Sequence, residues 1–123
     1  MAARIARECG IKGLLFDIEQ YNSELFNYSK QREKETRTWD EYGQQVRKRG
    51  RELMESFQSE YPDIVIFLTF GYCLPWAQMG GKRELSEVSY GLLAPLLDGM
   101  LDAAKVEAKP VIVDGCELAY SYK

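Results

Sequence analysis

Two acidic residues directly follow the first apolar run of the chain. Asp17 and Glu19 come after Gly13–Phe16, a run that predicts a short buried strand. Because side chains alternate along a strand, Leu15, Asp17 and Glu19 share one face. Two carboxylates on one face repel each other, so one keeps its proton and can act as a general acid beside an ionised partner. The spacing therefore predicts Asp17 and Glu19 as candidate catalytic residues.

A second pair of acids, Asp114 and Glu117, follows the apolar run Pro110–Val113. The carboxyl ends of parallel strands lie at one edge of a sheet, so these acids are expected at the same rim as the first pair. Asp114 and Glu117 have opposite parity in an extended chain, so only one of them faces the shared cavity. We expect Glu117 to be that one, as a third candidate catalytic residue.

These carboxylates have two other interpretations. In a structural one, Asp17 and Glu19 cap helix N-termini or pair with lysines in a loop. In a chemical one, Asp17, Glu19 and Asp114 hold Mg²⁺ or Mn²⁺, because these hard ions prefer carboxylate oxygens. The sequence has no spacing motif for a metal site, so we expect no metal and no other cofactor.

Residue types that are missing exclude several kinds of site. The chain has no histidine, which excludes Ser-His-Asp and Cys-His nucleophile activation and histidine-ligated zinc. Its cysteines, Cys9, Cys73 and Cys116, form no Cys-x-x-Cys pair, so neither a disulfide framework nor a thiolate zinc site is predicted. The first residues do not resemble a signal peptide. We therefore expect reduced thiols, with Cys73 and Cys116 buried, and a cytoplasmic location.

The charge pattern argues against nucleic acid and membranes as partners. Lys and Arg number 16 against 19 Asp and Glu, a net charge of −3, which gives no broad basic surface for nucleic acid. The basic segment 47–51 is followed by glutamates and predicts a solvated helix face. The apolar runs are far shorter than the roughly 18 residues that a membrane span needs.

Aromatic residues are frequent in the segments that follow the predicted strands. Flat rings beside carboxylates offer the apolar platform and the hydrogen-bonding groups that a sugar ring needs. Tyr21, Tyr72 and Trp76, together with Asp114, are therefore the candidate substrate-binding residues for a carbohydrate ligand. Packing is the alternative role of each ring. The wider set of rim aromatics contains Tyr28, Trp39, Phe70, Tyr120 and Tyr122.

Three apolar runs define the elements that position these residues. Gly13–Phe16, Ile64–Phe70 and Pro110–Val113 are continuously apolar and bounded by polar or turn residues, a pattern typical of buried parallel strands. Helical stretches between them are long enough for parallel crossovers. The chain is predicted to be one α/β domain over residues 1–123, in the order α-β-α-β-α-β, with a sheet covered on both faces. The segments 20–37 and 71–90 are expected to be long loops.

The helix between the first two strands carries the clearest signals. Thr38 and Glu41 have capping-box spacing, and Pro62 marks the end of the helix. Gly50 lies on its apolar stripe, where a glycine costs about 1 kcal/mol relative to alanine, so we expect a close approach of this helix to the sheet. A further helix is predicted over 93–104. The stripe consists of Tyr42, Val46, Leu53, Phe57 and Tyr61.

The segment 13–21, GLLFDIEQY, resembles a barrel strand of glycoside hydrolases and of glycosidase-like (βα)8 proteins. Its nearest pattern is the chitinase-type strand whose motif ends Asp-x-Glu followed by an aromatic residue. In that pattern Glu19 corresponds to the acid that protonates the glycosidic oxygen, and Asp17 to the carboxylate that assists it. Lys12 and Leu15 stand where the motif has earlier aspartates. The resemblance implies a partial TIM-barrel-like segment with glycosidase-like activity.

The chain is short for that fold. A (βα)8 barrel needs eight strands and about 250 residues, whereas we count three predicted strands in 123 residues. Unpaired parallel edges favour association, so we expect a homo-oligomer in which other copies complete the core. The alternative hypothesis is a non-catalytic α/β self-assembling module, or a barrel fragment without activity of its own.

Overall fold

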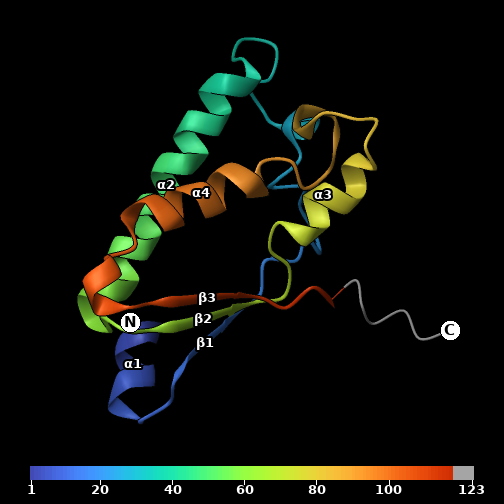
Figure 1. The fold of residues 1–123 in the computed structure, drawn as a ribbon. Helices are drawn as coiled ribbons and strands as arrows, with labels where there is room; N and C mark the ends of the chain where they lie inside the picture. Colours follow the sequence, from blue (N-terminus) through green and yellow to red (C-terminus); the bar gives the residue numbers. More distant parts are fainter. Residues whose placement is uncertain (118–123) are drawn as a thin grey trace, which may run out of the picture.

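The structure, a computed structural model, describes residues 1–117. Over these residues the chain has a mixed α/β fold with four α-helices and a three-stranded parallel sheet (Figure 1). Two of the predicted rim aromatics, Tyr120 and Tyr122, lie outside the described residues. The helices are α1 (Ala2–Glu8), α2 (Trp39–Glu60), α3 (Cys73–Met79) and α4 (Leu93–Ala103), and the strands are β1 (Gly13–Phe16), β2 (Val65–Leu68) and β3 (Val111–Asp114).

The strands lie in the order β1-β2-β3, and both pairings are parallel. Leu15 of β1 is in register with Phe67 of β2, which is in register with Val113 of β3. The predicted α/β class and the parallel pairing of the three apolar runs are therefore confirmed. The first and last strands of the sequence form the two edges of this sheet.

The two long helices, α2 and α4, cover one face of the sheet. Ile66 and Leu68 point toward them and are buried in the core. On the opposite face, which we call the open face, Leu15 is 70% exposed, Phe67 45% and Val111 46%. The prediction of a sheet covered on both faces is therefore wrong for residues 1–117. Continuous apolar runs indicate that both faces avoid water, but they do not say which segment covers each one.

The N-terminal end of α2 is fixed by the predicted capping box. The Glu41 backbone N–H donates to the Thr38 hydroxyl at 3.2 Å, and the Thr38 backbone N–H donates to the Glu41 carboxylate at 2.7 Å. These bonds satisfy donors that a helix start leaves without an intrahelical partner. The helix ends at Glu60, before Pro62, as predicted.

Glycines allow α2 and α4 to cross closely (Figure 1). A Cβ atom on Gly50 would lie 2.0 Å from the Leu96 carbonyl oxygen, and one on Gly99 would lie 1.9 Å from the Arg47 carbonyl oxygen. Gly50 therefore marks a close approach, but its partner is α4 rather than the predicted sheet. Any larger side chain at either position would force the two backbones apart.

The segment 71–90, predicted to be a loop, contains α3 and a short 3₁₀ turn at Leu85–Glu87. Pro75 is compatible with α3 because it lies in the first turn, where its missing N–H breaks no intrahelical bond. The Asp114 carboxylate, from the end of β3, accepts a hydrogen bond from the Cys73 backbone N–H at 3.1 Å. The start of α3 is thus capped from a distant strand, which a local reading of the sequence misses.

None of the helices in residues 1–117 has the length and apolar character needed to cross a membrane.

Candidate functional site

Asp17 and Glu19 lie just beyond the carboxyl end of β1. Ile18, between them, is buried in the core under the helices, so alternation directs its two neighbours toward the open face. The Asp17 carboxylate accepts the Glu19 backbone N–H at 2.9 Å and the Tyr21 hydroxyl at 3.0 Å. The second bond raises the pKa of Tyr21 to about 12, with smaller contributions from burial and from the charge of Asp17. Asp17 therefore holds Tyr21 and the start of the loop in place.

Thr69 connects the segments that leave all three strands. It follows β2 directly; its hydroxyl accepts the Ile18 backbone N–H at 3.4 Å, and its carbonyl accepts the Glu117 backbone N–H at 3.3 Å. The chain beyond β1 and the chain beyond β3 are thereby drawn together across the central strand. Thr69 was not among the predicted site residues, although a threonine inside an otherwise apolar run was the available signal.

Glu117 consequently lies beside Glu19, and we call these two residues the acid pair. Burial raises the pKa of Glu117 above its ordinary value, and the neighbouring carboxylates of Glu19 and, last in order, Asp17 raise it further. Its Oε2 atom is buried without a hydrogen-bond partner among the described residues. Burial and a like charge both favour the protonated carboxyl, so the acid pair can hold one proton between two groups.

Asp114 lies on the other side of the sheet, toward the helices. It is in register with the buried Leu68, and its carboxylate accepts the backbone N–H groups of Gly71 at 2.8 Å, Cys73 at 3.1 Å and Cys116 at 3.0 Å. Burial alone would raise the pKa of Asp114, but the Cys73 thiol and these N–H groups together hold it below its ordinary value. Asp114 is therefore a positioning residue, and the structure does not bring it to the acid pair as a substrate-binding group.

The placement of Asp114 also removes the alternative metal site. The proposed set of Asp17, Glu19 and Asp114 is divided between the two sides of the sheet. Within residues 1–117, no group of three acidic or cysteine side chains is arranged to hold a metal ion.

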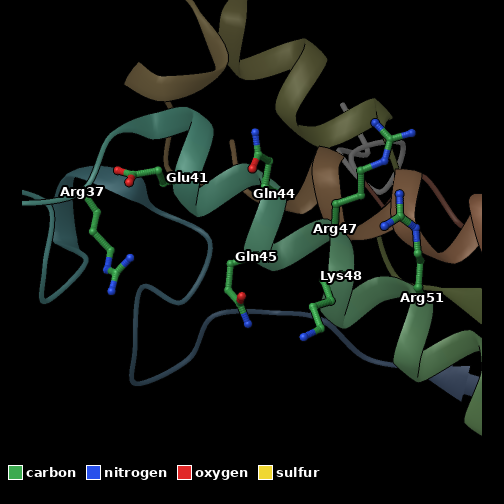
Figure 2. Close-up of a pocket in the computed structure, with 7 residues that line it drawn as sticks. All are labelled: Arg37, Glu41, Gln44, Gln45, Arg47, Lys48 and Arg51. Atoms are coloured by element: carbon green, nitrogen blue, oxygen red, sulfur yellow. The ribbon is translucent and has the colours of Figure 1, made fainter.

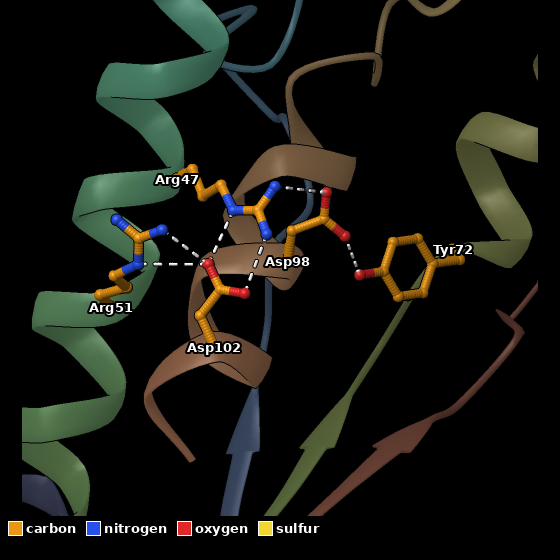
Figure 3. A network of polar contacts seen from close by, with 5 residues as sticks. All are labelled: Arg47, Arg51, Tyr72, Asp98 and Asp102. Carbon is orange, nitrogen blue, oxygen red and sulfur yellow. Dashed lines mark hydrogen bonds and ion pairs between the residues drawn. The ribbon is translucent and has the colours of Figure 1, made fainter.

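Of the three predicted sugar-binding aromatics, Tyr21 lies on the loop after β1, whereas Tyr72 and Trp76 lie one turn apart at α3. Tyr21 stands beside the acids and is 71% exposed. Tyr72 points toward α4, where its hydroxyl donates to Asp98 at 2.6 Å (Figure 3), and it lines a small cavity of about 150 Å³ together with Asp114. Burial, and then the bond to Asp98, raises the pKa of Tyr72. Trp76 is exposed on α3, so Tyr21 is the aromatic that the structure joins to the acids.

The basic segment 47–51 is neutralised by acids. Arg47 donates to both oxygens of Asp102 at 2.7 and 2.8 Å, and Arg51 donates to one of them at 2.8 and 3.1 Å (Figure 3). These bonds lower the pKa of Asp102. The side chains of Arg47 and Arg51 also line an open hollow of about 520 Å³ on α2, together with Arg37 and Lys48 (Figure 2). Because Arg37 and Lys48 pair with glutamates, this hollow offers no free cationic cluster in the described part of the chain.

Comparison of the chain with protein-family models, with curated proteins and with solved structures found no match.

Proposed function

We propose that the chain is a glycosidase-like unit whose reactive groups are the acid pair, Glu19 and Glu117. The observation that carries this proposal is the meeting of two carboxyl groups, from the ends of β1 and β3, at the carboxyl edge of a parallel sheet. This edge is where parallel α/β enzymes place their catalytic groups. General acid catalysis of glycoside cleavage needs a carboxyl group that stays protonated at a pH where ordinary glutamates are ionised.

The raised pKa of Glu117 supports it as the proton donor to the leaving oxygen, with Glu19 as the carboxylate partner. The resemblance to the chitinase-type strand implies instead that Glu19 is the proton donor. Asp17 acts as a positioning residue, because its carboxylate fixes the Tyr21 hydroxyl. The exposed ring of Tyr21 is then available to pack against the apolar face of a sugar. Retaining enzymes keep their carboxyl groups about 5–5.5 Å apart. Retention therefore requires that a bound sugar holds the neighbouring carboxyl groups of Glu19 and Glu117 at that distance.

We also propose that the open face is the inner face of a barrel. In a TIM barrel the helices lie outside and the inward side chains of the strands fill the interior. Leu15, Phe67 and Val111 would form such an interior layer, because they lie on the face opposite α2 and α4. The chain would then be a partial TIM-barrel-like segment, completed by further copies, with the acid pair at the mouth.

The direct test is hydrolysis of a panel of chromogenic 4-nitrophenyl glycosides. We expect Glu117→Gln and Glu19→Gln each to lower kcat/KM by about 10²–10⁴-fold, the usual contribution of a general acid. Glu55→Gln, the same chemical change on the exposed surface of α2, is the matched control and should leave the rate unchanged. Equal activity in wild type and in both pair variants would contradict the proposal, as would a folded wild-type chain that cleaves none of the panel.

A second candidate function, a self-assembling module without catalysis, is favoured by the open face. Its exposed apolar side chains, and the two sheet edges that β1 and β3 form, are surfaces that another copy can cover. Light scattering over a dilution series tests this. The wild type should be an oligomer and Phe67→Lys should dissociate it, while Val106→Lys, at an exposed position outside the sheet, should not. A monomer at every concentration would exclude this function, and a stable oligomer without hydrolysis would favour it over the first.

A further inference from the structure

Two of the three cysteines meet at the carboxyl edge of the sheet. Cys73 is the first residue of α3, and its Sγ atom donates to Asp114 Oδ1 at 3.1 Å. Cys116 lies two residues after β3, and its backbone N–H donates to the same oxygen at 3.0 Å. Both residues are half-buried, whereas Cys9 is exposed. A single carboxylate oxygen therefore binds the sulfur of one cysteine and the backbone of the other.

The backbone at Cys116 is held in an unusual conformation. Its φ is +46°, in the left-handed region that residues other than glycine seldom adopt. Such a conformation persists only where surrounding bonds determine it. Here the Cys116 N–H is bound by Asp114, and the preceding Gly115 N–H donates to the Leu68 carbonyl at 2.9 Å. The Asp114 carboxylate thereby holds Cys116 beside the start of α3, whose Cys73 N–H it also accepts.

The two thiols are neighbours beside the carboxylate that the two cysteines share. Burial raises the pKa of the Cys73 thiol to about 12, with further contributions from Asp114 and from the adjacent Cys116 thiol. The Cys73 thiol therefore keeps its proton at neutral pH. It is a poor nucleophile toward a peroxide in solution, because the attacking species is the thiolate. As the second thiol it attacks a neighbouring sulfur that the fold already holds in place, so the attack is intramolecular.

We propose that Cys73 and Cys116 form a reversible intramolecular disulfide when the folded chain meets a hydroperoxide. In the first step the Cys116 sulfur attacks one peroxide oxygen, the O–O bond breaks, and one water leaves with the thiol proton, which gives a sulfenic acid on Cys116. In the second step Cys73 Sγ attacks Cys116 Sγ. The S–O bond breaks and the hydroxyl leaves as a second water with the Cys73 proton. Two thiols are oxidised by two electrons and hydrogen peroxide is reduced to two waters.

The disulfide would change the surroundings of the acid pair without using either glutamate. Its formation removes the thiol hydrogen bond that Asp114 accepts and links the start of α3 to the residue before Glu117. The inference concerns the cysteines alone and stands whether or not the acid pair is catalytic.

The test uses the full chain with Cys9→Ser, which removes the exposed thiol and leaves the pair. Before treatment, two thiols should react with Ellman's reagent in denaturant. After hydrogen peroxide, both should be lost, the mass should fall by that of two hydrogen atoms, and a digest should contain a peptide that links positions 73 and 116. A phosphine reductant should restore both thiols.

A matched pair of variants tests the order of the steps. With Cys73→Ser, the sulfenic acid on Cys116 has no partner and should be trapped by dimedone. With Cys116→Ser, the remaining Cys73 should label much more slowly. The proposal is overturned if folded Cys9→Ser protein keeps both thiols after peroxide treatment, if the disulfide joins two different chains, or if Cys116 gains oxygen while Cys73 stays free. Because the Cys9→Ser experiment is sufficient by itself, a folding defect in the other variants does not affect the outcome.

Discussion

Replacing Gly50 by alanine tests whether the close crossing of α2 and α4 holds the fold together. The added methyl carbon would lie 2.0 Å from the Leu96 carbonyl oxygen, where ordinary contacts are 3.4–4 Å. The Leu96 carbonyl oxygen belongs to the backbone of α4, and the new Cβ atom is fixed by the backbone of α2. No side-chain rotation can therefore relieve the clash, and the helices must separate. Overpacking of this kind costs about 3 kcal/mol at the upper end of its usual range. Alanine recovers about 1 kcal/mol through its better helix propensity, so the free energy of unfolding should fall by about 2 kcal/mol.

Gly43 provides the control on the same helix. A Cβ atom there meets nothing within 4 Å, so Gly43→Ala should instead raise the free energy of unfolding, by up to about 1 kcal/mol. Gly99→Ala introduces a clash on the other helix of the same crossing. In the double variant the second substitution should lower the free energy of unfolding by less than it does alone, because the first has already separated the helices. Urea denaturation followed by circular dichroism measures all three variants. If Gly50→Ala were as stable as Gly43→Ala, the close helix crossing would be refuted.

Further predictions concern the carboxyl edge of the sheet. Asp114→Asn leaves donors at Gly71 and α3 without their charged acceptor and should lower the free energy of unfolding by about 1–2 kcal/mol, measured in urea; an unchanged midpoint would contradict its positioning role. Asp17→Asn should return the pKa of Tyr21 from about 12 toward its ordinary 10.0, observed as earlier ionisation of one tyrosine in an ultraviolet titration, and superimposable titration curves would contradict this contact. The raised pKa of Glu117 means that its contribution to stability is present at low pH and is lost as the pH rises above the ordinary value of 4.5 and through the raised one. Glu117→Gln should remove this loss of stability, which is measured by comparing urea midpoints across this pH range. Parallel pH profiles of wild type and Glu117→Gln would contradict the raised pKa.

Much of the fold could be predicted because its signals are local. The capping box at Thr38 and Glu41, the stop at Pro62 and the three apolar runs each depend on residues a few positions apart. The structure has all of these features. Gly50 was recognised as unusual because it interrupts an apolar stripe. Its partner could not be recognised, because the crossing with α4 depends on Leu96 carbonyl geometry that no local pattern encodes.

The site was predictable in its residue types and less so in its arrangement. Alternation along β1 placed Asp17 and Glu19 on one face, and opposite parity left one of Asp114 and Glu117 to join them. Glu117 is the one that lies beside Glu19 in the structure. The cap that Asp114 provides for α3 joins positions 41 residues apart, which sequence periodicity cannot reveal. The bridge made by Thr69 is likewise tertiary. An apolar strand face can meet a helix, a further copy or water, and atoms outside the strand decide which. Coverage of the open face was therefore predicted incorrectly.

Site-resolved carboxyl titration by NMR tests whether Glu19 and Glu117 interact directly at the carboxyl edge. With ¹³C-labelled glutamate, the wild type should give a Glu117 resonance that titrates above the ordinary value of 4.5, because burial, Glu19 and Asp17 all raise its pKa. Glu19→Gln should move that pKa back toward the ordinary value, and Asp17→Asn should move it less. A Glu117 titration that is the same in wild type and in Glu19→Gln would show that the two carboxyl groups do not meet, and the proposed acid pair would be refuted.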